Sequence, residues 1–288
     1  MHCDGCVTKE HQLGELTYSH GVLQGAIMHP DKKQVIPVMP EAIRNKDGTK
    51  KQDCELDASK RLIANLRAAH PRQKFLLCGD GLMSNRPMIE ATCAGDMHYL
   101  FVAKPGNHKY LVEWLSAYDA LPTTEWTDGK GNRHIYSGKN DVPLNGNEKT
   151  IMVNWFPYQF INSTGKITKT HSWVTDIEMN KTHVIAMTKA GRCQWKIENE
   201  CFNTLKNQGY YLEHNYGHGD KNLSYSMTIL TLLAFYFHQI FELTDGVYQA
   251  CRASFGSKSH LWGNFRASIR MIIVEDWAQL MDLMLRPD

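Results

Sequence analysis

Apolar and polar residues recur with different periods along the chain, and each change of period predicts an element. Between Asp53 and Pro71, leucine and isoleucine recur at helical spacing, so we expect a helix over residues 54–69. Residues 74–80 form a short apolar run bounded by glycine, the pattern of a strand buried on both faces. The same reasoning predicts two strands, or a strand and a hairpin, within residues 15–38, a helix that starts near residue 85, a strand over residues 98–104 and a helix over residues 108–118.

Residues 121–178 lack a helical period. Asp-Gly and Asn-Gly pairs interrupt short runs such as HIY, TIMVNWF and KITKTHSWV, so we expect an antiparallel β insertion. Apolar helical stretches follow around residues 223–243, 245–254 and 262–285, and the stripe on the last one predicts core packing for Trp262, Phe265, Ile269, Ile272, Trp277 and Leu280. The α/β pattern divides the chain into a core of residues 1–120 and 179–222, an insertion of residues 121–178 and C-terminal helices over residues 223–288.

The stretch RCQWKIENECFNTLK, residues 192–206, places an acid among apolar residues. In an α-helix, Glu198 falls in the middle of an arc formed by Trp195, Ile197, Cys201, Phe202 and Leu205. A carboxylate on a buried helix face is costly unless it is paired, protonated or bound to a metal. Two kinds of partner fit: a basic residue such as Lys206 or Arg192, or a divalent cation that Glu198 shares with another carboxylate.

Asp80 stands at the carboxyl end of the strand expected over residues 74–80. In an open α/β sheet, ligands and metals bind at the carboxyl ends of the strands, so Asp80 is a candidate metal ligand. The alternative is that its side chain caps the turn that follows the strand.

The composition is that of an ordinary globular protein, with 288 residues, 42% hydrophobic and 22% charged. A formal net charge of +2 does not by itself indicate nucleic-acid binding, which must therefore rest on local clusters. The eight cysteines are scattered, which favours a reducing cytoplasm, and the opening residues lack the pattern of a signal peptide. His238 and Gln239 interrupt the most apolar segment, so we expect a buried helix there and no membrane partner.

Cys3 and Cys6 have the spacing of half a zinc site, and His2 or His11 could supply a further ligand. A second cysteine pair is missing. The alternative is two free thiols in a loop.

Three strings resemble DDE-type insertion-sequence transposases. The first is the W-x-I-E motif at Trp195–Glu198, which in that family lies on a basic helix and supplies the last catalytic acid. The others are HSWVTDI at residues 171–177 and NQGYYLEHNYGHGDKN at residues 207–222. Relatives often also carry a cysteine pair like that at Cys3 and Cys6.

The resemblance implies an RNase H-like sheet on which three acids hold Mg²⁺ or Mn²⁺ for DNA cleavage and strand transfer. It makes Asp80 the second acid and Glu198 the third. The strands within residues 15–38 then take the second and third places in that sheet, so the first strand and its acid are expected before residue 1. Asp4 has no apolar strand before it and Asp31 lies in a turn, so we expect an amino-terminal truncation.

The resemblance also implies DNA as partner, in the cytoplasm, and a homodimer that brings two transposon ends together. Family members usually have Tyr and Arg where this chain has Gly191 and Gln194, so phosphate contacts in the helix differ. Basic candidates for phosphate contacts are Lys50, Lys51, Lys104, His108, Lys109 and Lys206, although a surface lysine is commonly only solvated.

Three functions compete. The first is a transposase that cuts and joins DNA. The second is a non-catalytic fragment that binds DNA or the full-length enzyme and interferes with it. The third is a metal-dependent nuclease of the RNase H-like group outside transposition.

Overall fold

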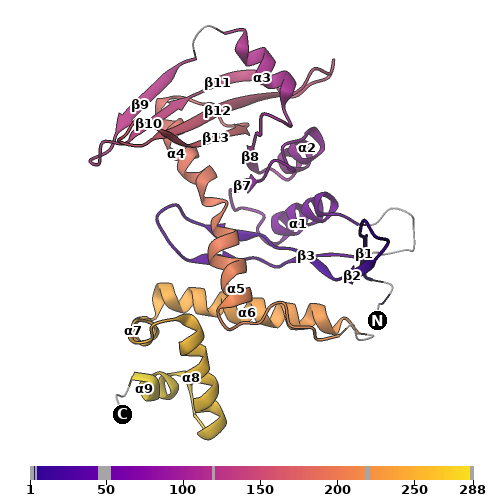
Figure 1. Ribbon diagram of the computed structural model, residues 1–288. Helices are drawn as coiled ribbons and strands as arrows, with labels where there is room; N and C mark the ends of the chain where they lie inside the picture. The colour runs from indigo at the N-terminus through magenta and orange to yellow at the C-terminus, as the bar shows by residue number, and fades with distance from the viewer. Residues whose placement is uncertain (1–2, 4, 45–52, 119–120, 218–220, 286–288) are drawn as a thin grey trace. The chain divides into compact units, whose positions relative to one another are not determined.

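The computed structural model describes residues 3, 5–44, 53–118, 121–217 and 221–285, and it divides the chain into two compact units. One unit is Glu55–Gln194. The other joins Met1–Cys54 to Trp195–Asp288. These boundaries differ from those of the four parts expected from the sequence. Figure 1 labels the elements of each unit.

The unit Glu55–Gln194 is built on a mixed sheet of seven strands. Strands β7 (Leu76–Gly79) and β8 (His98–Val102) are parallel, as the two apolar runs predict. Five antiparallel strands extend the sheet beyond β8: β13 (Ile167–Thr175), β12 (Met152–Ile161), β10 (Arg133–Ser137) and β9 (Thr123–Thr127) in that order, with β11 (Lys139–Pro143) beside β12. The antiparallel strands expected after residue 121 therefore continue the sheet of β7, and β7 forms its edge in the described chain.

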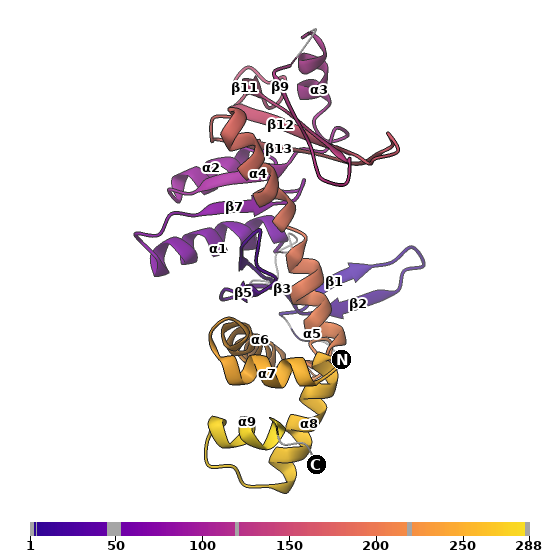
Figure 2. The same ribbon diagram turned by 90° about the vertical axis from the view of Figure 1, so that its left-hand side faces the viewer.

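Both faces of this sheet are covered, which explains why β7 and β8 are apolar apart from His98 at the start of β8. Tyr99 and Phe101 of β8 pack into a cluster with α1 (Glu55–Ala69), α2 (Arg86–Ala94) and α3 (Lys109–Ser116). Leu100 and Val102 of the same strand pack into a second cluster with α4 (Lys181–Cys193). Because successive side chains of a strand point to opposite faces, the alternation assigns α4 to one face and the other three helices to the opposite face (Figure 2).

The strands of the other unit are short and pair locally, in three sheets of two strands each. The pairs are β1 (Val7–Glu10) with β2 (Leu16–Ser19), β3 (Gly21–Leu23) with β6 (Glu41–Ile43), and β4 (Ala26–Met28) with β5 (Val35–Pro37). The expectation that the strands within residues 15–38 share the sheet of Asp80 is wrong for the described chain. These strands pair with other strands within residues 7–43 instead.

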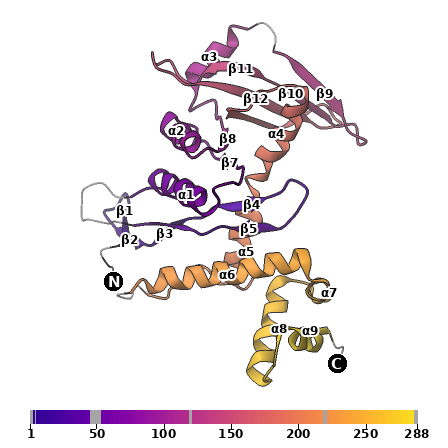
Figure 3. The ribbon, with the colours of Figure 1, turned by 180° about the vertical axis from the view of Figure 1, so that it is seen from behind.

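Helices make up the remainder of this unit. A π-helix, η1 (Ile197–Phe202), leads into α5 (Asn203–Asn207), and the long α6 (Leu223–Thr244) is followed by α7 (Gly246–Ser254), α8 (Lys258–Met271) and α9 (Trp277–Leu285) (Figure 3). The stripe expected over residues 262–285 is broken, because Ile272 has an extended backbone and ends α8. Trp262, Phe265 and Leu280 are buried as expected, whereas Ile269 and Ile272 are exposed.

Helix α6 is not the buried helix that its composition predicts. Leu232, Phe235 and Gln239 are buried, whereas Leu230, Leu233 and Phe237 are exposed, so only one side of the helix is covered. In the described chain α6 alone is long and apolar enough to cross a membrane by length and composition. Core helices of soluble proteins pass the same test, which makes this feature weak evidence on location.

Candidate functional site

Asp80 lies where the sequence places it, directly after β7. Its Oδ1 atom accepts a hydrogen bond from the amide of Leu82 at 2.9 Å, so the side chain does cap the turn. The residue is nevertheless exposed, and no cation of the described chain forms an ion pair with it. The cap therefore uses one carboxylate oxygen and leaves the other open.

The glycines on both sides of Asp80 are fixed by close packing. A β-carbon on Gly79 would lie 2.5 Å from Sδ of Met83 and 2.9 Å from the ring of Phe101. A β-carbon on Gly81 would lie 3.3 Å from Cδ of Lys104, so the stem of Lys104 runs beside the turn that holds Asp80. The parallel strands β7 and β8 thus bring the acid and one candidate phosphate contact to the same edge.

Gln194 also holds the end of β7. With its amide oriented so that both polar atoms are satisfied, it donates to the carbonyl of Gly79 at 3.2 Å and accepts from the amide of Asp80 at 2.8 Å. The residue that stands where the resembling family has Arg therefore supports the backbone of the candidate metal ligand.

Glu198 does not lie on a buried stripe, and that expectation is wrong. The side chain is exposed, as is Trp195, whereas Cys201 and Leu205 are fully buried. Residues 197–202 form a π-helix, in which each residue turns the chain by less than the 100° of an α-helix. The smaller rotation per residue adds up along the segment. Cys201 and Leu205 therefore lie on a different side of the helix from Glu198, and the acid faces water. π segments are rare and occur frequently at functional sites.

The basic partners considered for Glu198 are engaged elsewhere. Lys206 forms an ion pair with Glu213 at 2.8 Å, and the guanidinium of Arg192 lies over the ring of Tyr158, 5.5 Å from its centroid. No cation of the described chain pairs with Glu198. Asp80 belongs to the unit Glu55–Gln194, and Glu198 belongs to the other unit.

The π-helix is fastened to the loop between β4 and β5. Lys196 Nζ donates to the carbonyls of His29 at 2.7 Å, Pro30 at 2.9 Å and Lys32 at 2.7 Å. Glu200 forms an ion pair with Lys33 at 3.8 Å. The residues on either side of Glu198 are therefore held by this loop, a contact that no local sequence signal predicts.

The remaining phosphate-contact candidates differ in exposure. Lys109 is exposed, as the prediction requires, and Lys50 and Lys51 lie outside the described residues. His108 is wrong as a candidate, because its side chain is buried and burial lowers its pKa, which leaves the ring uncharged at neutral pH.

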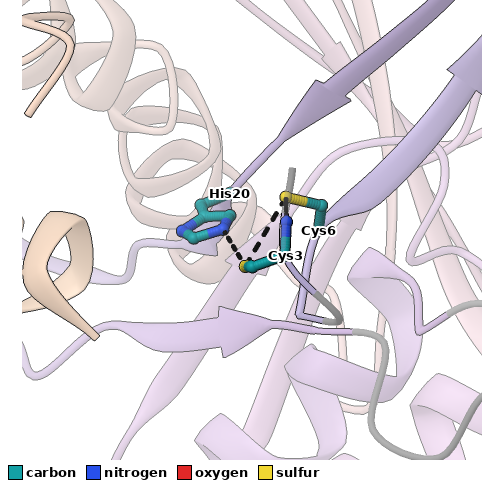
Figure 4. A group of neighbouring side chains, drawn as sticks. All are labelled: Cys3, Cys6 and His20. Atoms are coloured by element: carbon teal, nitrogen blue, oxygen red, sulfur yellow. Dashed lines mark hydrogen bonds between the residues drawn. The ribbon is translucent and has the colours of Figure 1, made fainter. Parts of the chain in front are cut away.

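A second cluster of chemistry-bearing side chains lies near the N-terminus, around Cys3 and Cys6 (Figure 4). Their sulfur atoms are 3.7 Å apart, too far for a disulfide bond. The third member is His20, whose Nε2 atom lies 3.2 Å from Sγ of Cys3. The three ligand atoms all lie within 4.8 Å of one another.

The histidine of this cluster is His20, whereas the sequence suggested His2 or His11. Nε2 of His11 lies 3.0 Å from Oγ1 of Thr17, within the β1–β2 hairpin, and His2 lies outside the described residues. His20 follows β2 directly, so the return of the hairpin brings it back to the cysteines. A prediction of a hairpin over residues 7–19 would have identified His20 as the third member of the cluster.

No protein-family model matches the chain, and no curated protein matches it.

Proposed function

We propose that this chain is the catalytic part of a DDE-type insertion-sequence transposase, in which Asp80 and Glu198 hold magnesium for DNA cleavage and strand transfer. Three strings support the family, namely WKIE, HSWVTDI and NQGYYLEHNYGHGDKN. The mixed sheet flanked by helices is compatible with the RNase H-like fold that the proposal requires.

One observation carries the proposal: Asp80 is an exposed carboxylate at the carboxyl end of a strand whose two faces are packed. Its hydrogen bond from the amide of Leu82 uses one carboxylate oxygen, and no basic residue of the described chain forms an ion pair with it. Glu198, on the π-helix, is likewise exposed, and no basic residue of the described chain forms an ion pair with it. Each acid is open to solvent, where a cation can reach it.

The donor chemistry of these residues fits magnesium. Mg²⁺ prefers hard oxygen ligands and is commonly bound by one or two carboxylates together with substrate phosphates. When bound, such ions neutralise charge on a phosphate during in-line displacement. The side chains of Asp80 and Glu198 would hold the metal, Gln194 would fix the backbone at Asp80, and Lys104 would bind a DNA phosphate beside it.

The partners follow from the same proposal. The substrate is DNA, both the transposon ends and the target, and the synapsis of two ends requires a homodimer. A cytoplasmic protein without a membrane partner is consistent with this reaction, and Lys109 and Lys206 are exposed for further phosphate contacts.

The alternative is a non-catalytic fragment that binds DNA or the full-length transposase. It is favoured by the edge position of β7 among the described strands. A sheet edge presents unpaired backbone groups that can bind a strand from another chain.

Nicking of supercoiled plasmid that carries the ends of the insertion sequence tests the proposal. We expect Mg²⁺-dependent nicking that Asp80→Asn and Glu198→Gln each abolish and that the control Glu213→Gln retains. The substitution Asp80→Asn keeps an oxygen for the Leu82 amide, so it removes the charge and not the cap. DNA binding without nicking would favour the alternative, and nicking that survives both substitutions would refute the assignment of these acids.

A further inference from the structure

The cluster of Cys3, Cys6 and His20 has the dimensions of a metal site. A tetrahedral zinc ion with Zn–S of about 2.3 Å and Zn–N of about 2.0–2.1 Å separates two sulfur ligands by about 3.8 Å and sulfur from nitrogen by about 3.6 Å. The two sulfurs here are 3.7 Å apart, and Sγ of Cys3 is 3.2 Å from Nε2 of His20. Sγ of Cys6 and Nε2 of His20 lie within 4.8 Å of each other, so side-chain shifts of about 1 Å would accommodate the ion.

The imidazole of His20 is held in the orientation that a ligand requires. Its Nδ1 atom lies 2.7 Å from Oγ of Ser224, in the first turn of α6. When Nδ1–H donates to this hydroxyl, the lone pair of Nε2 faces the sulfur atoms, as Figure 4 shows for the ring. Such a partner fixes the tautomer and the ring orientation of a metal-bound histidine.

The backbone also forms hydrogen bonds within this cluster. The amide of Cys3 donates to Sγ of Cys6 at 3.4 Å, and the amide of Cys6 donates to the carbonyl of Cys3 at 3.0 Å. Burial raises the pKa of the Cys6 thiol, and a backbone hydrogen bond partly offsets this rise. The tight turn of the C-x-x-C segment therefore directs both sulfur atoms to one side, toward His20.

We propose that Cys3, Cys6 and His20 bind one zinc ion whose fourth ligand is water, and that Ser224 is the residue that positions His20. Sulfur and imidazole ligands select zinc over magnesium, so this site is chemically distinct from the acids Asp80 and Glu198. It does not depend on the proposed transposase activity.

The role of the ion is structural. The β1–β2 hairpin has two strands only, and every residue of β2 is exposed. A hairpin of two strands is marginally stable by itself. The metal would join the start of β1 to His20, at the end of β2, and through Ser224 to α6, and so tie the hairpin to the helices of its unit.

Metal binding to the full chain tests this proposal. After removal of metal by chelation under reducing conditions, we expect one zinc or cobalt ion per chain, with a thiolate-to-cobalt charge-transfer band and the strong visible bands of a tetrahedral site. Cys3→Ser and His20→Asn should each abolish the binding. Ser224→Ala should keep the spectrum and weaken zinc binding about 10- to 100-fold.

Three controls make the result specific. Cys93→Ser changes an exposed cysteine of the other unit, His11→Asn changes the histidine of the same hairpin, and the pair Asp80→Asn with Glu198→Gln removes the proposed magnesium ligands. All should bind zinc as the unchanged chain does. Zinc should also slow amide hydrogen exchange in β1 and β2. Binding that is unchanged in His20→Asn, a cobalt spectrum without a thiolate band, or no retained metal would overturn the proposal.

Discussion

Gly191 of α4 lies directly against the indole of Trp173 in β13. A β-carbon at residue 191 would lie 2.5 Å from Cε2 and 2.6 Å from Nε1 of that ring, which is one of the largest fully buried side chains. Trp173 is part of the HSWVTDI string, and Gly191 stands where the resembling family usually has Tyr. The close approach explains why no larger residue fits here in this chain.

The contact predicts that Gly191→Ala destabilises the unit Glu55–Gln194. A rigid buried ring has little room to move, so overpacking should cost about 1–3 kcal/mol of unfolding free energy. The matched control is Gly263→Ala in α8, where nothing lies within 4 Å and helix propensity should add about 1 kcal/mol. Urea unfolding of both variants measures the difference, and equal effects would contradict the packing argument.

The three carbonyls around Lys196 predict a different cost for two lysines of the same segment. Lys196→Met removes hydrogen bonds from a charged group to the loop after β4 and should cost about 1.5–3 kcal/mol. Lys206→Met removes only an exposed ion pair to Glu213 and should cost less than about 1 kcal/mol. Thermal and urea unfolding of both variants measure which substitution costs more stability. A larger loss from Lys206→Met would show that the loop is not held by Lys196.

The exposure of Glu198 predicts that its charge contributes little to folding. Glu198→Gln should change the free energy of unfolding by less than about 0.5 kcal/mol. Leu205→Ala, a few residues along the same helical segment, should cost about 2–5 kcal/mol, because Leu205 is fully buried. A large loss of stability from Glu198→Gln would instead support the buried position that an ideal α-helix predicts.

The pH dependence of stability has a specific source in His238. Its ring stacks on Trp262 at 4.0 Å and its Nδ1 atom lies 2.7 Å from the hydroxyl of Tyr210. Burial, aided by Lys258, lowers the pKa of His238 from 6.5 to about 4. The unfolded chain therefore takes up a proton at a higher pH than the folded chain, so the folded state loses stability as the pH falls from 6.5 toward 4.

Between pH 6.5 and pH 5 this loss should be about 2 kcal/mol. The His238→Gln variant should lose less stability over this interval than the unchanged chain, by about that amount. His260→Gln, which changes an exposed histidine on α8, is the control and should keep the original dependence. Identical slopes for the unchanged chain and His238→Gln would show that this ring does not control the acid sensitivity.

The elements that the sequence predicts well are those whose burial repeats locally. The runs that form β7 and β8 are apolar apart from His98 because helices cover both faces, and α1 follows its leucine spacing almost to the residue. Asp80 could be placed for the same reason, since a strand end between glycines is visible in the sequence. No comparable signal exists for Gln194, whose contact with β7 depends on a residue more than a hundred positions away.

The errors have two physical causes. Some features depend on contacts between residues distant in sequence, and one depends on a helix whose geometry is not that of an ideal α-helix. Glu198 was assigned to a buried stripe because an α-helical rotation was assumed through what is a π-helix. His20 was missed because it meets the cysteines only when the hairpin closes. Helix α6 was assigned to the interior from its composition, although only one of its sides packs against the protein.

The π-helix gives the segment an unusual sensitivity to its own length. Six residues close there over a wider turn than an α-helix uses, so the stretch accommodates more chain for the same rise. Loss of a single codon within residues 197–202 would let the stretch close as an ordinary α-helix with nearly the same total rotation, so the surfaces before and after it would keep their orientation. Only the residues inside the stretch, Glu198 and Glu200 among them, would move to new positions around the axis.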